Sequence, residues 1–243
     1  MASEPKVAFR SSNGQAPGFD RLLEACSRIP IVTIGSRSVT LQFECRDVQT
    51  EMFRSDPLDL VSAYTRDMAQ FTEYVPNPGS IVMIGLGGGA LAKWCLHRFP
   101  DAEITVIEIN EHVIRLRDIF RIPANNAHFR VVCAEGADFL SSTQHQPDVL
   151  LVDGFDYEGQ PPQLCTEQFY DDCFRVLRPD GVLVVNLCDS DEVTLRALTE
   201  KIQQAFGSQV RVLQEQPGNQ IIFARKRTQS AIYYDGALSF SRK

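Results

Sequence analysis

The stretch Ile81-Val82-Met83-Ile84-Gly85-Leu86-Gly87-Gly88-Gly89-Ala90 decides the fold of this chain. Its four leading apolar residues predict a short buried strand, and four glycines within the next five positions lead into an amphipathic helix. Glycines allow a tight turn from strand to helix and let a ligand touch bare backbone. Amide groups at the start of the helix then point at that ligand. We therefore predict that a cofactor contacts Gly85, Gly87, Gly88 and Gly89.

The next apolar run, Ile104–Ile109, carries an acid, Glu108, near its end. This acid follows the glycines by about twenty residues, the spacing at which a carboxylate binds a ribose 2′-hydroxyl in a strand–helix–strand unit. The pattern predicts an adenosine-containing cofactor at the carboxyl ends of a parallel sheet. The alternative is a glycine-rich turn that holds no ligand.

Length and composition limit the possible functions. With 243 residues, of which 44% are hydrophobic, the chain can form one α/β domain and a small appendage. A net charge of −7 argues against a nucleic-acid backbone as the main partner and is compatible with a cationic substrate. The N-terminal sequence MASEPKVAFR has no apolar leader, and no apolar run approaches the length of a membrane span. We therefore expect no secretion, no membrane contact and no nucleic acid.

The seven cysteines are odd in number, scattered and without a CxxC pair. Most of them lie in apolar runs, namely Cys95, Cys133, Cys173 and Cys188. We interpret them as reduced core residues of a cytoplasmic protein rather than as disulfides or metal ligands. The four histidines have no paired spacing, and we predict no metal site.

A cluster of helix- and strand-breaking residues, Pro76-Asn77-Pro78-Gly79, divides the chain into predicted domains 1–75 and 76–243. Before it, apolar and polar residues alternate over Val39–Cys45, which is typical of a half-buried antiparallel strand. Strands over 31–34 and 48–53 and a helix over 59–74 complete the prediction of a small N-terminal β-domain.

After the cluster, strand and helix patterns alternate. The predicted strands are 81–84, 104–109, 129–133, 148–153, 182–187, 210–214 and 220–225. The predicted helices are 91–99, 113–120, one capped by Thr166 that ends near Leu177, and one capped by Ser190 that ends near Phe206. The expected fold class is α/β, a seven-stranded and mostly parallel Rossmann-like sheet with a reversed strand at one edge and a C-terminal antiparallel hairpin that turns at 217–219.

The choice of cofactor depends on topology. The glycine stretch also fits G-x-G-x-x-A, so a dinucleotide such as NAD is one alternative. An antiparallel hairpin after the fifth parallel strand departs from the dinucleotide topology. The segment 177–185, LRPDGVLVV, resembles the L-x-P-G-G-x-L turn of S-adenosylmethionine-dependent methyltransferases. Both features favour a sulfonium nucleoside over NAD.

Across residues 39–225 the chain resembles the spermidine synthase (polyamine aminopropyltransferase) family, in particular its shorter bacterial relatives. The family's G-G-G-D-G motif corresponds to 85–89, and its acid after the second strand corresponds to Glu108. Further similar elements are Glu135-Gly136-Ala137 after the third strand, Asp153-Gly154-Phe155-Asp156 with Pro161-Pro162 beyond, Thr166-Glu167-Gln168-Phe169-Tyr170, Asp47-Val48-Gln49, and Tyr64.

This resemblance implies a class I methyltransferase fold and transfer of an aminopropyl group from decarboxylated S-adenosylmethionine to a small amine. It implies a nucleoside site built from the glycines and from Glu108, Glu135, Gly136 and Ala137. It implies substrate contacts from Asp156, Tyr64 and Gln49. The family likeness and the open edge of a small N-terminal sheet also predict a homodimer.

Two motifs depart from the family pattern. Gly88 stands where the family has an aspartate that contacts the amino-terminal part of the nucleoside donor. The stretch Tyr64-Thr65-Arg66-Asp67-Met68 lacks the His or Gln of the family's Y-H/Q-E-M helix. The identity of the acceptor amine therefore does not follow from the resemblance.

Chemistry assigns a role to the acid after the fourth strand. An amine that attacks the carbon next to a sulfonium must lose a proton, and a carboxylate can accept it. Asp153 ends an apolar run, and Asp156 lies three positions later, where a like charge raises one pKa. We predict Asp153 as the base, Asp156 as an anchor for substrate or loop, and Glu135 as the acceptor of a hydrogen bond from the adenine amino group. The alternatives are a methyltransferase that uses S-adenosylmethionine itself and a non-catalytic nucleoside-binding protein.

Overall fold

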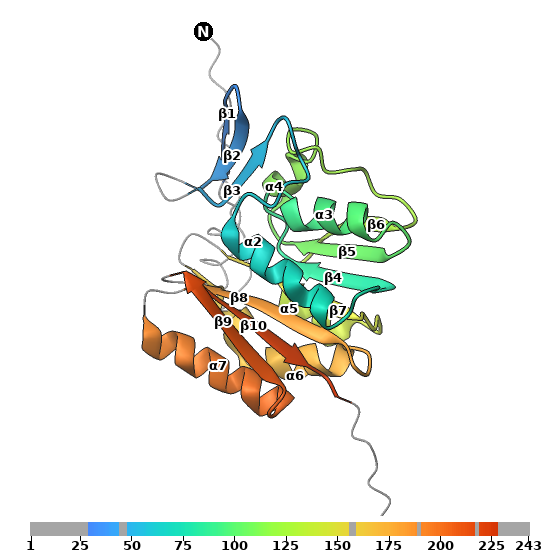
Figure 1. The fold of residues 1–243 in the computed structure, drawn as a ribbon, viewed down its shortest axis with the longest axis vertical. Coiled ribbons are helices and arrows are strands. Elements are labelled where there is room, and N and C mark those ends of the chain that lie inside the picture. Colours follow the sequence, from blue (N-terminus) through green and yellow to red (C-terminus); the bar gives the residue numbers. More distant parts are fainter. Residues whose placement is uncertain (1–28, 44–47, 156–158, 189–190, 217–218, 228–243) are drawn as a thin grey trace, which may run out of the picture.

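The computed structural model describes residues 29–43, 48–155, 159–188, 191–216 and 219–227. These residues form two sheets, a three-stranded antiparallel sheet and a seven-stranded, mostly parallel sheet with helices on both faces (Figure 1). The predicted fold class is confirmed. The predicted division into domains 1–75 and 76–243 stays a prediction. Both sheets contribute residues to one continuous hydrophobic core.

The small sheet consists of β1 (Ile31–Ile34), β2 (Ser38–Gln42) and β3 (Thr50–Phe53) in that order. Because β2 alternates, it buries Val39 and Leu41 against the rest of the protein. The helix predicted over 59–74 is shorter than expected, with α2 (Ala63–Met68) tightening into the 3₁₀ helix η1 (Ala69–Glu73). The Arg66 guanidinium donates to the carbonyls of Leu60 and Val61, which ties the helix to the segment before it.

The large sheet has the order β6-β5-β4-β7-β8-β10-β9. Its strands are β4 (Ser80–Ile84), β5 (Glu103–Glu108), β6 (Phe129–Cys133), β7 (Val149–Val152), β8 (Val182–Cys188), β9 (Val210–Gln216) and β10 (Asn219–Arg225). The reversed strand is β10, which pairs antiparallel with both β8 and β9. It therefore lies one position in from the edge, and not at the edge as expected, because this position buries Ile221, Ile222 and Phe223.

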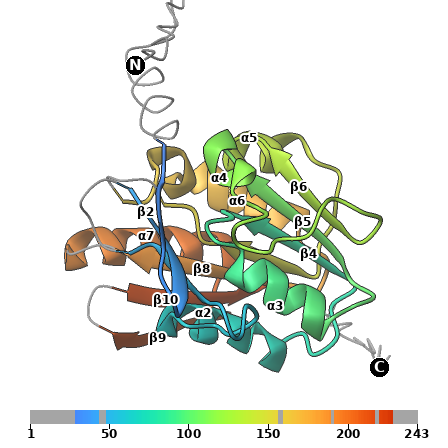
Figure 2. The same cartoon turned by 90° about the horizontal axis from the view of Figure 1, so that it is seen from above.

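The helices cover the large sheet on two faces (Figures 1 and 2). One hydrophobic core lies beneath α2, α3 (Ala90–Arg98) and α4 (Glu111–Arg115), and the other beneath α5 (Gly136–Ser142), α6 (Glu167–Val176) and α7 (Glu192–Phe206). Thr166 caps α6 as predicted, since its hydroxyl accepts from the Phe169 amide at 3.0 Å. Asp191 caps α7, whereas the predicted cap, Ser190, lies outside the described residues.

Two other helices differ from expectation. The predicted helix 113–120 already ends at Arg115, and the chain then turns through Arg121, which has a positive φ of 55°. Helix α5 was not predicted, because its residues, GADFLSS, start with a glycine and show no apolar stripe. The turn at 217–218 in the C-terminal hairpin lies outside the described residues.

The cysteine prediction is half right. Cys95 and Cys173 are buried and free, whereas Cys133 and Cys188 are exposed, which corrects their expected place in the core. Each of the exposed pair is the last residue of its strand, β6 or β8, where the chain leaves the sheet for solvent. Within the described part of the chain, no helix has the length and apolar character needed to cross a membrane.

The order of the strands positions the site. Strand β4 is central, with β5 and β6 on one side and β7 and β8 on the other. In such a sheet the connections leave β4 and β7 in opposite directions, and a crevice opens outside their carboxyl ends. The predicted glycines and the described acids lie at the ends of strands that reach this crevice, or just after them.

Candidate active site

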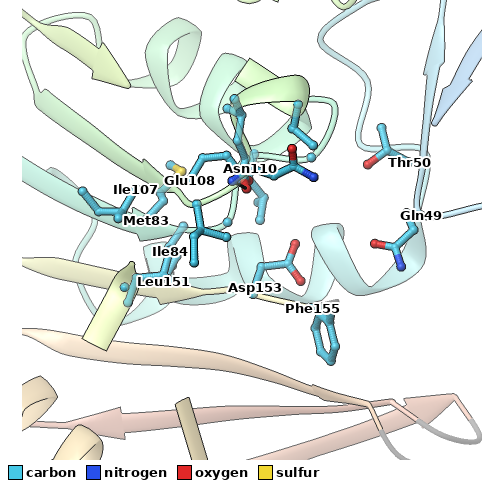
Figure 3. Close-up of a pocket in the computed structure, with 18 of the residues that line it drawn as sticks. Gln49, Thr50, Met83, Ile84, Ile107, Glu108, Asn110, Leu151, Asp153 and Phe155 are labelled. Atoms are coloured by element: carbon cyan, nitrogen blue, oxygen red, sulfur yellow. Dashed lines mark hydrogen bonds between the residues drawn. The ribbon is translucent and has the colours of Figure 1, made fainter. Parts of the chain in front are cut away.

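A cavity opens at the carboxyl ends of β4, β5, β6 and β7 and extends beneath the small sheet (Figure 3). Most of the predicted site residues line it, namely Gln49, Tyr64, Gly85, Gly87, Glu108, Glu135, Gly136 and Asp153. Gly88, Gly89 and Ala137 are not part of the cavity wall, and their contact with a ligand stays a prediction. Asp156 and Asp47 lie outside the described residues.

The backbone conformation of the turn after β4 requires glycine at two positions. Gly85 has a φ of +96°, and a Cβ on it would overlap the carbonyl oxygen of Asp153. Gly89 has a φ of +67° and begins α3, and a Cβ there would lie 2.5 Å from the Ile122 side chain. Larger residues at either position would be strained, so the turn can bring its backbone close to β7 and to a ligand only with glycine.

Glu108 holds the two loops that flank the crevice. Its Oε2 accepts from the Leu86 amide at 2.9 Å, and its Oε1 accepts from the Asn110 amide at 2.8 Å. Burial raises the pKa of this carboxyl, and the hydrogen bonds from backbone amides oppose that rise. The amides of Gly87 and Ile109 also hydrogen-bond to this carboxylate, so backbone groups on both sides of the crevice fix its oxygens.

Asn110 lines the cavity next to Glu108 and was missed by the sequence analysis. It is buried and caps α4, since its Oδ1 accepts from the His112 amide at 2.9 Å. Its position between a strand and a helix was the available signal. The side chain fixes the start of α4, and the backbone amide of the same residue binds Glu108.

Glu135 and Gly136 form another part of the cavity wall, after β6. Glu135 caps α5, because its Oε2 accepts from the Asp138 amide at 2.8 Å. A Cβ on Gly136 would lie 2.7 Å from Cγ2 of Ile84, so the glycine lets α5 lie close to β4. Ala137 packs instead into the core beneath α5.

Asp153 follows β7 and carries its carboxylate into the cavity (Figure 3). Its Oδ1 accepts from Nδ2 of Asn186 at 2.9 Å, and the Tyr64 hydroxyl also donates to it. Burial raises the pKa of Asp153, and both hydrogen bonds oppose that rise. The pKa of Tyr64 is raised well above its ordinary value by burial and then by the charge of Asp153, so its hydroxyl stays a donor.

Asn186 was another residue that the sequence analysis missed. It is buried in β8, where it is a polar residue within the apolar run 182–187, and that interruption was a usable signal. Its amide fixes the Asp153 carboxylate from the neighbouring strand.

The small sheet contributes the far wall of the cavity. Figure 3 shows Gln49 and Thr50 across the cavity from Met83 and Leu151, with Asp153 between the two sides. Thr50, which the sequence analysis missed, accepts a hydrogen bond from the Gly88 amide at 3.3 Å. The small sheet is thereby joined directly to the glycine turn.

A parallel sheet with a glycine turn after its central strand and acids after the neighbouring strands defines an α/β protein of the nucleoside-binding class. The family model described as the spermine/spermidine synthase domain matches residues 61–230, and the chain belongs to this family. The family resemblance seen in the sequence is therefore confirmed.

Relatives and solved structures agree with this membership. A polyamine aminopropyltransferase of Chromobacterium violaceum is 36% identical over 190 residues, which cover 77% of this chain and 72% of the relative. One of Neisseria meningitidis is 33% identical over 212 residues, covering 85% and 80%. A probable spermidine synthase from Corynebacterium glutamicum has a similar fold, with a TM-score of 0.72 at 18% identity, covering 81% of this chain and 76% of that one. Human methyltransferase-like protein 13, in complex with SAH, has a TM-score of 0.62 at 19% identity, covering 70% and 84%.

Proposed function

We propose that this protein transfers an aminopropyl group from decarboxylated S-adenosylmethionine to an amine. Family membership and relatives that are named polyamine aminopropyltransferases support this assignment. The structural observation that most strongly supports aminopropyl transfer is the charge of the cavity. Its described wall contains three carboxylic acids, Glu108, Glu135 and Asp153, and no lysine, arginine or histidine.

An acidic wall selects between the two candidate donors. Decarboxylated S-adenosylmethionine carries a sulfonium and an ammonium group and no carboxylate, and the acceptor amine is also a cation. S-adenosylmethionine itself carries a carboxylate, which an acidic cavity without a basic side chain disfavours. The cavity therefore favours aminopropyl transfer over methyl transfer.

The nucleoside would lie along the carboxyl ends of β4, β5 and β6. Bare backbone at Gly85 and Gly87 allows close approach, Glu108 would accept from the ribose hydroxyls, and Glu135 would accept from the adenine amino group. The position of Glu108 in the cavity wall supports its role, and the backbone amides it binds keep its oxygens in place.

The reaction needs one proton acceptor. The amine nitrogen would attack the propyl carbon next to sulfur, forming an N–C bond while the C–S bond breaks and its electron pair goes to sulfur. The products are methylthioadenosine and the aminopropylated amine, and the proton of the amine would go to Asp153. Asn186 and Tyr64 would hold the Asp153 carboxylate in place during this transfer. Tyr64 and Gln49 line the same cavity and would contact the acceptor, as would Asp156.

Isothermal titration with three ligands tests the assignment. Decarboxylated S-adenosylmethionine and methylthioadenosine should bind, and S-adenosylmethionine should bind more weakly than the decarboxylated form. Tighter binding of S-adenosylmethionine, together with methyl transfer to any acceptor, would instead support a methyltransferase. Tight binding of NADH without binding of any adenosyl thioether would contradict the assignment.

We also propose that the protein is a cytoplasmic homodimer. Strand β1 forms an edge of the small sheet, and its Ile31 and Ile34 side chains are exposed. An open strand edge with apolar side chains favours pairing with a second copy. Sedimentation equilibrium should give a dimer that Ile34→Lys weakens and that Val193→Lys, a change at an exposed apolar residue of α7, leaves intact. A monomeric wild type would contradict the proposal.

A further inference from the structure

Two glutamines in the loop after β7 carry buried amide atoms without a partner. Both side-chain polar atoms of Gln160 and the Oε1 of Gln163 have no hydrogen bond among the described residues. An unpaired buried amide atom is destabilising, and in a folded protein it calls for an explanation. At the wall of a cavity, the simplest explanation is a partner that arrives with the ligand.

Only one of the two glutamines belongs to that wall. Gln163, in the 3₁₀ helix η2 (Pro162–Cys165), lines the cavity, whereas Gln160 does not. The next residue, Leu164, packs against Gly154 and Gly136. Its Cδ1 lies 2.7 Å from the position that a Cβ on Gly154 would take, and its Cδ2 lies 3.4 Å from the position of a Cβ on Gly136. Gln163 therefore belongs to the end of the cavity that Glu135 and Gly136 form.

This end of the cavity has the surface that a purine base needs. The side chains of Ile84 and Leu164 pack against Gly136 and Gly154. Because the two glycines add no side chains, the walls at this end of the cavity are apolar. Glu135 and Gln163, two residues with polar side chains, line the same cavity. A purine base has the matching character, with flat apolar faces and hydrogen-bonding groups along its edge.

We propose that Gln163 recognises the adenine of the nucleoside, with its Oε1 accepting from the exocyclic amino group. A glutamine amide pairs with adenine in a bidentate manner, since its Oε1 accepts from N6 while its Nε2 donates to a ring nitrogen. The amino group has two hydrogens, so Glu135 can accept the other one. A 6-oxo purine would instead bring an oxygen toward the Glu135 carboxylate and Gln163 Oε1. This inference rests on the proposed nucleoside site and adds the residue that selects its base.

The test compares two nucleosides by isothermal titration, 5′-methylthioadenosine and 5′-methylthioinosine. The wild type should prefer the adenosine compound. Gln163→Leu should weaken binding of methylthioadenosine by about tenfold, as expected for loss of a hydrogen bond, and leave binding of methylthioinosine nearly unchanged. Because the variant removes an unpaired polar atom, its melting temperature should stay the same or rise, which shows that it folds.

Gln160→Leu is the matched control, since it changes the same residue type in the same loop but outside the cavity wall. It should leave both affinities unchanged. If Gln163→Leu keeps the affinity and the base preference of the wild type, or loses affinity for both nucleosides equally, the inference is overturned while the nucleoside site stands. If the wild type binds neither nucleoside, the proposed function itself fails.

Discussion

The methyl group of Thr50 occupies the place that a side chain on Gly88 would need. A Cβ on Gly88 would overlap Cγ2 of Thr50 and would lie 2.9 Å from Cδ1 of Phe120. The Thr50 hydroxyl also accepts from the Gly88 amide. The aspartate that the family motif has at this position therefore cannot be introduced here without a change at Thr50. Thr50 on β3 and Gly88 in the glycine turn therefore fit each other.

Gly88→Ala should lower the free energy of unfolding by about 1–3 kcal/mol, the usual cost of an extra methyl group in a packed site. Gly88 is not among the glycines with positive φ, so this cost is steric. Thr50→Ser removes the methyl group and keeps the hydroxyl. The double variant should recover part of the loss in urea unfolding, since Phe120 still limits the space. Strictly additive effects would contradict the fit between the two residues.

Asp153→Asn should reduce turnover by about a hundredfold or more, the range expected when a general base is lost. The change keeps the shape of the side chain, so titration with methylthioadenosine should give nearly the same affinity. Asp148→Asn is the matched control, because Asp148 precedes β7 at the opposite end of the sheet and binds the Gly79 and Ser80 amides and Arg178. That variant should lose stability and keep turnover. Near-native turnover of Asp153→Asn would mean that the base is elsewhere.

The dependence of turnover on pH should report the raised pKa of Asp153. The base must be ionised, so turnover at saturating amine should fall as the pH drops through that pKa, at a higher pH than for an ordinary carboxyl group. Tyr64→Phe removes a hydrogen bond that lowers the pKa and should move the fall to higher pH. Tyr74, whose ring stacks on Phe223, provides the control, and Tyr74→Phe should leave the pH of the fall unchanged. An unchanged profile in Tyr64→Phe would show that Asp153 does not control the fall.

Glu108→Ala should weaken binding of methylthioadenosine by roughly 1.5–3 kcal/mol, the value of a hydrogen bond to a charged group. The same change frees the Leu86 and Asn110 amides, so some stability should be lost as well. Glu111→Ala, which removes an exposed ion pair with Arg115, should alter neither affinity nor stability appreciably. Unaltered affinity in Glu108→Ala would exclude Glu108 from the nucleoside site.

Much of the fold could be predicted because its signals are local. The apolar runs of β4, β6 and β8 and the Thr166 cap of α6 can be seen in the sequence and hold in the structure. Helix α5 has no such signal, since its start depends on the Glu135 cap and on Gly136 lying close to Ile84. The position of β10 inside the sheet depends on long-range pairing with β8, which periodicity does not report.

The site was predictable where a residue lies at the end of a strand or just after it, as Glu108, Glu135 and Asp153 do. Thr50 could not be found in this way, because its role depends on the approach of the small sheet to the glycine turn. Asn186 acts from a strand adjacent to β7 and is distant from Asp153 in sequence. The interruption of an apolar run by Asn186 is visible in the sequence, but its contact with Asp153 depends on the pairing of β8 with β7.

The most direct measurement of the central claim is a product analysis by mass spectrometry. The wild-type protein is incubated with decarboxylated S-adenosylmethionine and a set of monoamines and linear diamines, and Asp153→Asn is treated in parallel. We expect equal amounts of methylthioadenosine and of one aminopropylated amine with the wild type, and almost none of either with the variant. No aminopropylated product from any amine, or methylated product formed from S-adenosylmethionine alone, would contradict it.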